Sequence, residues 1–304
     1  MRSWGIVGGA WGDGGGRCMA APDGPIRRVG PGSGRARLMV MAATPPAADP
    51  HRPPPHVQSW QILRSAGPAG AFHHRAVPSP VEPAAWIHQV RAPALVLGSA
   101  QPDSVVDTAT AAGDRVEVTR RRSGGGLVSL VPGNDCWIDL IIPRQSSLWV
   151  EDVGRAFHWV GSVWADALTA VLPPDLAATV AVYTGPPLGR EAGRVVCFAG
   201  LGPGEVTVAG RKVVGLSLRR WRDGARFQCA MTWRWSGDIL ARYLSAEARA
   251  TLEGVTHCDV TRLPAGLPDL HRAPDPTEVV DAVLMRLPDP GPACPAGFEP
   301  MISA

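Results

Sequence analysis

The sequence predicts an α+β fold, with helices flanking a mixed, largely antiparallel β-sheet. The first observation is that short strand-like segments follow one another through tight turns at Gly210-Arg211 and Asp223-Gly224, a pattern typical of hairpins. The second is that helical segments do not alternate regularly with strands, which disfavours a parallel βαβ sheet. Hydrophobic residues make up 45% of the 304 residues, enough to form a core against such a sheet.

The chain divides into three parts of different composition. Residues 1–58 are rich in glycine and proline and bury too little apolar area to offset the entropy of ordering. We expect this part to be disordered, or to be a mis-annotated extension ahead of Met39 or Met41. The folded domain is expected over residues 59–288, followed by a loose tail over 289–304.

The first half of the domain is predicted to mix strands and helices. The apolar run that ends at Gly98 indicates a buried strand, and the alternation at 116–120 indicates a strand with one wet face. Proline near the first turn favours a helix at 83–90. In chain order we expect a strand at 60–63, helix at 83–90, strand at 94–97, helix at 105–112, strand at 116–120, and a hairpin of 127–131 with 136–142.

The clearest predicted helix covers residues 151–171. Apolar side chains recur there at three- and four-residue spacing, which indicates one face against a core, and Pro173-Pro174 ends the pattern. Further strands are expected at 179–183, 194–198, 205–208, 213–219 and 227–233. Further helices are expected at 238–244, 245–252 and 276–287.

Charge and composition exclude several classes of protein. The formal net charge of +3 is too balanced to indicate a nucleic-acid binder, and no apolar run approaches the ~20 residues that span a bilayer. The six cysteines form no C-x-x-C pair, so no zinc ribbon, redox dithiol or other metal site is expected. No convincing signal peptide is found, and we expect a cytoplasmic protein with reduced thiols.

Two histidine-containing clusters are considered as sites and set aside. Adjacent histidines rarely chelate one ion together, so His73 and His74 are expected to face solvent. The His257-Cys258-Asp259 cluster is an equally weak candidate.

The lysine content is unusual, because Lys212 is the single lysine beside 29 arginines. Wherever any positively charged side chain would serve, this sequence therefore uses arginine. A compact ammonium differs from a planar guanidinium in what it can contact, which favours a chemical role for Lys212 over chance survival of one surface residue.

Two segments carry most of the candidate chemistry. In the first, Gly124-Gly125-Gly126 follows a run of arginines and lies between two predicted strands, so its backbone can approach a ligand closely with free N–H groups. The second, residues 197–217, places Lys212 at a strand-turn-strand junction, where it could stabilise negative charge on a phosphate or a carbonyl oxygen.

Together these segments resemble the catalytic domain of the lipoate–protein ligase family, which is related to biotin–protein ligases and octanoyltransferases. The first motif is Arg121-Arg122-Ser123-Gly124-Gly125-Gly126-Leu127-Val128, and the second, about ninety residues later, is Gly210-Arg211-Lys212-Val213-Val214-Gly215-Leu216-Ser217. The upstream segment Pro93–Gln101 also fits, and the resemblance covers roughly residues 58–255.

The resemblance implies a biotin/lipoate ligase-like fold and the transfer of a lipoyl or octanoyl group to a lysine of a carrier domain. The carrier would be the lipoyl domain of a 2-oxoacid dehydrogenase or the glycine cleavage protein, with no nucleic acid and no membrane involved. Lys212 is then the expected catalytic residue. The residues expected to bind substrate are Arg121, Arg122, Ser123, Gly124, Gly125, Gly126, Gly215 and Ser217.

The sequence also departs from the family pattern. Leu130 occupies the usual histidine position of the first motif, and Gly204-Glu205 replaces the usual Asn-Asp ahead of the lysine strand. Asn-Asp is suited to Mg²⁺ and ATP, so an ATP-dependent ligase would lack its usual metal ligands.

One branch of the family uses no ATP and moves octanoyl from acyl carrier protein through a cysteine thioester. Cys197-Phe198 lies fifteen residues before Lys212, as in that branch, and Cys197 is the second expected catalytic residue, although a buried structural cysteine is equally consistent. Three hypotheses therefore remain: a ligase with ATP and Mg²⁺, a Cys197 transferase with no cofactor, and a non-catalytic acyl- or carrier-binding relative.

Overall fold

The structure is a computed structural model, which describes residues 59–235, 237–256, 265–267 and 275–291. The expectations for residues 1–58, for most of the tail and for the His257-Cys258-Asp259 cluster lie outside the described residues. None of the helices in the described part combines the length and the apolar character needed to cross a bilayer.

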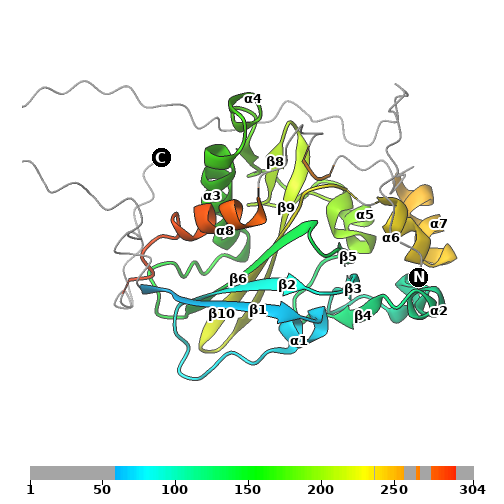
Figure 1. Cartoon of the computed structure of the whole chain (residues 1–304), viewed down its shortest axis with the longest axis horizontal. Helices are drawn as coiled ribbons and strands as arrows, with labels where there is room; N and C mark the ends of the chain where they lie inside the picture. Colours follow the sequence, from blue (N-terminus) through cyan, green and yellow to red (C-terminus); the bar gives the residue numbers. More distant parts are fainter. Residues whose placement is uncertain (1–58, 236, 257–264, 268–274, 292–304) are drawn as a thin grey trace, which may run out of the picture.

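Two β-sheets form the centre of the described structure (Figure 1). The larger sheet contains, in spatial order, β1 (Gln61–Gly67), β2 (Ala84–Val90), β6 (Asp135–Pro143), β10 (Gly224–Thr232), β9 (Arg211–Trp221), β8 (Val206–Val208) and β7 (Ala181–Val182). The smaller sheet contains β4 (Glu117–Arg120), β3 (Ala94–Leu97) and β5 (Val128–Leu130). β1 pairs with β2 in parallel, as does β3 with β4, and the other pairs are antiparallel. The predicted α+β fold with a mixed, largely antiparallel sheet is confirmed.

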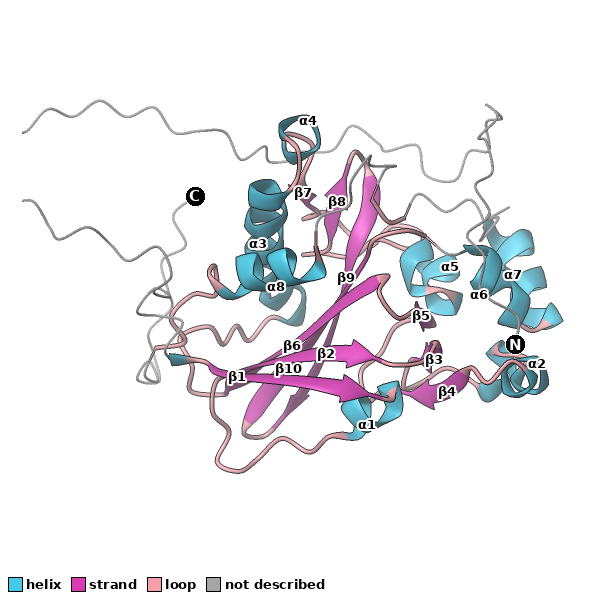
Figure 2. Ribbon diagram, viewed as in Figure 1, coloured by secondary structure: helices cyan, strands magenta, loops and turns pink. Residues whose placement is uncertain are grey.

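The helices lie in two groups around these sheets (Figure 2). The first group is α3 (Val153–Val171) and α8 (Pro276–Leu284), which pack together against one face of the larger sheet. Beside the smaller sheet lie α2 (Thr108–Gly113), α5 (Arg190–Val195), α6 (Gly237–Tyr243) and α7 (Ala246–Thr256). The remaining short elements are α1 (Ala69–His74), α4 (Pro174–Ala177), and the 3-10 turns η2 (Asp103–Val105) and η3 (Cys197–Ala199).

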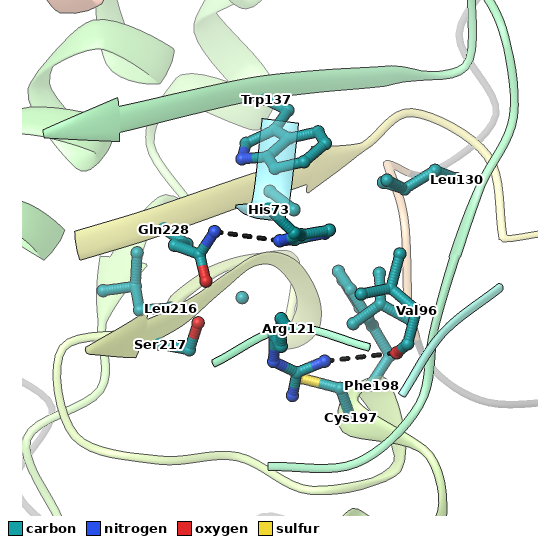
Figure 3. A pocket seen from close by; sticks show the side chains of 13 residues that line it. His73, Val96, Arg121, Leu130, Trp137, Cys197, Phe198, Leu216, Ser217 and Gln228 are labelled. Carbon is teal, nitrogen blue, oxygen red and sulfur yellow. Dashed lines mark hydrogen bonds between the residues drawn. The ribbon is translucent and has the colours of Figure 1, made fainter. Parts of the chain in front are cut away.

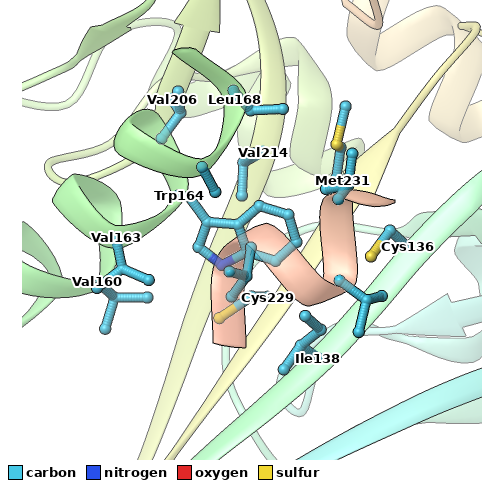
Figure 4. Close-up of a cluster of buried hydrophobic side chains, with 14 of the residues drawn as sticks. Cys136, Ile138, Val160, Val163, Trp164, Leu168, Val206, Val214, Cys229 and Met231 are labelled. Carbon is cyan, nitrogen blue, oxygen red and sulfur yellow. The ribbon is translucent and has the colours of Figure 1, made fainter. Parts of the chain in front are cut away.

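The main core forms between α3 and the larger sheet, as the apolar spacing predicted (Figure 4). Val160, Trp164 and Leu168 of α3 are completely buried there. Asp152 caps the helix by accepting a hydrogen bond from the Arg155 N–H at 2.7 Å. The helix is therefore fixed by its apolar face and by its cap together.

Three element predictions are wrong. Residues 84–90 form strand β2 and not a helix, because the segment lies between β1 and β6 with both faces covered, which removes the period-2 signal. Residues 194–198 form the end of α5 and the start of η3 and not a strand. Strands β5 and β6 do not pair as a hairpin, because β5 joins β3 in the smaller sheet.

A buried ion cluster ties β2, β6 and β10 together. The Asp139 carboxylate, which is fully buried, accepts hydrogen bonds from Trp137 Nε1 at 2.8 Å and from Arg226 Nε at 2.9 Å. His88 Nε2 lies 3.0 Å from Asp139 Oδ2. Burial alone would raise the pKa of Asp139, but Arg226 and His88 lower it to about 2.

Candidate active site

The glycine turn between β4 and β5 is held from inside by Arg121. The guanidinium of this buried side chain donates hydrogen bonds to the carbonyl oxygens of Val96 (3.2 Å), Gly124 (2.8 Å) and Gly126 (2.9 Å). Within the described chain, the N–H groups of residues 124–126 donate no hydrogen bond. The backbone N–H groups of the turn therefore remain free, as predicted. Most of the Arg121 N–H donors are used to hold the backbone of the turn.

Gly126 brings the Cys197 segment directly against this turn. A Cβ on Gly126 would lie 2.4 Å from the Gly193 carbonyl oxygen and 2.8 Å from the Cys197 nitrogen. The close approach allows Leu127 N–H to bond Val195 O and Cys197 N–H to bond Leu127 O, both at 2.9 Å. The first motif and the Cys197 segment are thus joined by backbone hydrogen bonds.

We expect Gly126→Ala to destabilise the protein by roughly 2 kcal/mol or more, because backbone atoms would have to move apart. Gly124→Ala is the matched control, since a Cβ there meets nothing within 4 Å. Urea denaturation of both variants measures the difference. Equal stability of the two variants would show that the close packing at Gly126 does not hold the segments together.

Lys212 projects from β9 into the same region and is 2% exposed. Its Nζ donates to the carbonyl oxygens of Cys197 and Gly200, each at 2.9 Å, and lies 2.7 Å from Glu205 Oε2. The Cys197 sulfur is 3.9 Å from Nζ. Burial lowers the pKa of Lys212, but Cys197 and Glu205 raise it more, so the net shift is upward and the ammonium stays charged.

Glu205 was not among the predicted site residues, although its place ahead of Lys212 was noted in the sequence. Its carboxylate accepts from Gly202 N–H at 2.7 Å and from Leu216 N–H at 3.2 Å, in addition to the Lys212 ion pair. It follows Gly204, whose φ of +81° and contact with Phe157 require glycine. The available signal was the presence of one acidic residue just ahead of the unique lysine.

A largely apolar pocket joins the glycine-turn side to the lysine strand (Figure 3). It contains about 430 Å³ of empty space, part of it open to solvent. Arg121 and Cys197 lie at one side of it, and His73 and Trp137 at the other. The remaining lining comes from Val96, Val128, Leu130, Phe198, Gly215, Leu216, Ser217, Gln228 and Ala230.

Four of the ten predicted site residues line this pocket, namely Arg121, Cys197, Gly215 and Ser217. Gly215 and Ser217 line it from β9, and Ser123 reaches its wall through a 2.9 Å hydrogen bond to Ser217. Arg122 is exposed and lies outside the lining, and Gly125 lines a neighbouring cavity with Gln101 and Arg194. The structure therefore brings Lys212, Cys197 and Arg121 together but leaves Arg122 apart.

His73 corrects the expectation that both histidines face solvent. The His74 side chain is exposed, but His73, on α1, is 5% exposed and lines the pocket. Its Nδ1 lies 3.0 Å from Gln228 Nε2, and Gln228 Oε1 accepts from Ser123 Oγ at 2.8 Å. Adjacent residues of a helix point in different directions, and the sequence had no signal that Gln228 would meet this ring.

The family model described as "Lipoyl protein ligase A/B catalytic domain" matches residues 71–287. The chain belongs to this family. It is therefore an enzyme of the ligase or transferase type, as the two motifs predicted. Among curated proteins, none is similar enough in sequence to count as a match.

Solved structures of lipoate–protein ligases share the fold. A bipartite lipoate protein ligase from a Thermoplasma acidophilum lipoylation system has 14% identity and a TM-score of 0.54, over 75% of this chain and 82% of that chain. A T. acidophilum structure with bound lipoic acid has 15% identity and a TM-score of 0.50, over 75% and 83% of the two chains. The predicted lipoate ligase-like fold is thus confirmed.

Proposed function

We propose that this lipoyl ligase family member transfers an octanoyl or lipoyl group to a lysine of a lipoyl carrier domain through a thioester on Cys197. One observation carries the proposal: the half-buried Cys197 sulfur lies at the pocket wall beside two buried cations. Lys212 Nζ is 3.9 Å away, and the Arg121 guanidinium interacts electrostatically with the same sulfur.

The two cations beside Cys197 differ in how their charge is balanced. Lys212 pairs with Glu205, whereas the Arg121 guanidinium bonds only to carbonyl oxygens among the described residues. Burial lowers the pKa of Arg121, and charge on Cys197 opposes that shift. Arg121 is therefore a buried cation without a carboxylate partner among the described residues, and it lines the same pocket as the Cys197 sulfur, where negative charge develops during acyl transfer.

In the proposed reaction the Cys197 thiolate attacks the carbonyl carbon of an acyl thioester donor, such as octanoyl-acyl carrier protein. The C–S bond to the donor breaks, and the donor thiolate takes a proton from solvent. The carrier-domain lysine amine then attacks the Cys197 thioester, an amide forms, and the amine's proton is released as the Cys197 thiolate returns. The three N–H donors of Lys212 are already bonded, so its positive charge stabilises the negative charge that develops in both steps through its electrostatic field and not through a direct hydrogen bond.

The ATP-dependent ligase is the second candidate, favoured by the family match and by a neighbour that binds lipoic acid. The residues at this site do not fit its Mg²⁺. Glu205, in the place of the usual Asn-Asp, is already committed to Lys212, Gly202 and Leu216.

The proposed acyl acceptor is a lipoyl carrier domain of a 2-oxoacid dehydrogenase or the glycine cleavage protein, in the cytoplasm. The T. acidophilum ligase that shares the fold is described with its E2 lipoyl domain, which supports a partner of this kind. Acyl carrier protein is the proposed donor for the thioester route.

Incubation with octanoyl-acyl carrier protein is expected to add one octanoyl group to Cys197, measured by intact mass and located by peptide mapping. Cys197→Ala should remain unmodified. Cys136 and Cys229 serve as internal controls, because burial raises the pKa of the Cys136 thiol to about 12 and also raises that of Cys229. If no adduct formed, and lipoate with ATP released pyrophosphate, the ligase would replace the transferase.

A further inference from the structure

The far wall of the pocket carries a buried donor without a partner. His73 is 5% exposed and lines the pocket, yet its Nε2 makes no hydrogen bond. Among the described residues lining the pocket, it is the one buried side-chain nitrogen or oxygen in this condition. Buried polar groups are normally hydrogen-bonded. The lack of a partner at His73 Nε2 therefore indicates that a ligand bonds to it.

The orientation of the Gln228 amide assigns the proton of the His73 ring to Nε2. Ser123 Oγ donates to Gln228 Oε1, so the Gln228 amide turns its Nε2 donor toward His73 Nδ1. Nδ1 is thereby the acceptor and Nε2 the donor. Burial lowers the pKa of His73 to about 3, which keeps the ring neutral with a single N–H at neutral pH.

The ring also packs against aromatic side chains at the end of the pocket away from the reacting sulfur. Its centroid lies 4.4 Å from that of Trp137, which in turn contacts Phe72 and His88 at 5.7 and 4.7 Å between centroids. Figure 3 shows His73 and Trp137 across the pocket from Arg121 and Cys197. Between them the walls are apolar, as an alkyl chain requires.

We infer that His73 Nε2–H reads the far end of the acyl group, so that the pocket prefers a medium-chain acyl group with an oxygen or sulfur acceptor at that end over a plain alkyl chain. This inference rests on the proposed function, because it places the acyl carbonyl at Cys197. A plain chain would fill the pocket and leave the donor unsatisfied, whereas an acceptor atom would satisfy it.

Calorimetric titration of the full chain with octanoate, lipoate and 8-hydroxyoctanoate tests the inference. The wild type is expected to bind 8-hydroxyoctanoate roughly fivefold to tenfold more tightly than octanoate. Lipoate should fall between them, because its sulfurs are weak acceptors. In His73→Phe, which keeps a ring but removes the N–H, the preference should disappear through weaker binding of the two acceptor-bearing acids.

Leu130→Met is the matched control, because it changes the same pocket without touching the donor. It should change the three affinities by a similar factor. A preference that survives in His73→Phe, or a wild type that binds the three acids equally, would overturn the inference and leave the Cys197 proposal intact. If the wild type bound none of the acids, the acyl pocket itself would be wrong.

A second measurement does not depend on any variant. In wild-type protein labelled with ¹⁵N-histidine, the His73 signals should show a proton on Nε2. That N–H resonance should move downfield with 8-hydroxyoctanoate and less with octanoate. A proton on Nδ1, or equal shifts with both acids, would contradict the proposal that Nε2–H donates a hydrogen bond to the far end of the acyl group.

Discussion

Asp139→Asn is expected to lower the free energy of unfolding by about 3–5 kcal/mol, the range for breaking a buried ion pair. The substitution leaves the buried Arg226 guanidinium without a counter-ion and weakens the contact with His88. It also disturbs three neighbouring strands at once, since the cluster links β2, β6 and β10. Urea denaturation at pH 7 measures the change.

The same carboxylate should make the protein sensitive to acid. The pKa of Asp139 in the folded protein is about 2, below its ordinary value of 3.8. Its contribution to stability is therefore fully present above about pH 4 and is lost as the pH falls toward 2. Between pH 4 and 2 the melting temperature of the wild type should fall more steeply than that of Asp139→Asn.

Asp281→Asn is the control for both measurements. Asp281 pairs with Arg64 at 3.0 Å, but both side chains are more than half exposed. Exposed pairs contribute about 0–1 kcal/mol, so this variant should be nearly as stable as the wild type. If Asp139→Asn were no less stable than Asp281→Asn, the buried cluster would not be a main support of the sheet.

Lys212→Met is expected to slow acylation of Cys197 by roughly 10²-fold or more, the size of effect seen when a transition-state charge donor is removed. It should also destabilise the protein by about 3–5 kcal/mol, because Glu205 would remain buried without a cation. Rapid-quench mass spectrometry with octanoyl-acyl carrier protein measures the rate, and thermal melting measures the stability.

The double variant Lys212→Met/Glu205→Gln separates these two effects. It removes the unpaired charge, so much of the stability should return while acylation stays slow. Arg211→Lys is the matched control on the preceding residue, whose side chain donates hydrogen bonds to Ala265 O and Gly266 O outside the pocket. Acylation at the wild-type rate in the double variant would show that Lys212 supports only the structure.

The sequence predicted those parts of the site that contain a rare residue type or an unusual run of one residue type. Lys212 was distinguishable because every other Lys or Arg position holds arginine, and the glycine turn because three glycines between strands have few other uses. Glu205 and His73 were not among the predicted site residues, because their contacts depend on partners that the fold brings close. His73 meets Gln228, which lies 155 residues away in the chain.

The fold was predicted best where one face of an element meets solvent. The α3 spacing gave that helix correctly because its polar side remains visible in the sequence. Strand β2 was predicted to be a helix because both of its faces are buried, so that polar and apolar residues do not alternate along it. The separation of β5 from β6 depends on which sheet each joins, which local patterning does not specify.

The three acceptors around Lys212 Nζ have a consequence for the timing of catalysis. Two backbone carbonyls and a carboxylate already surround this ammonium, in place of a shell of solvent molecules. An arriving thioester therefore meets a cation whose dehydration was completed when the chain folded. The free energy needed to remove water from this ammonium is therefore part of the folding of the enzyme and is not required again in each catalytic cycle.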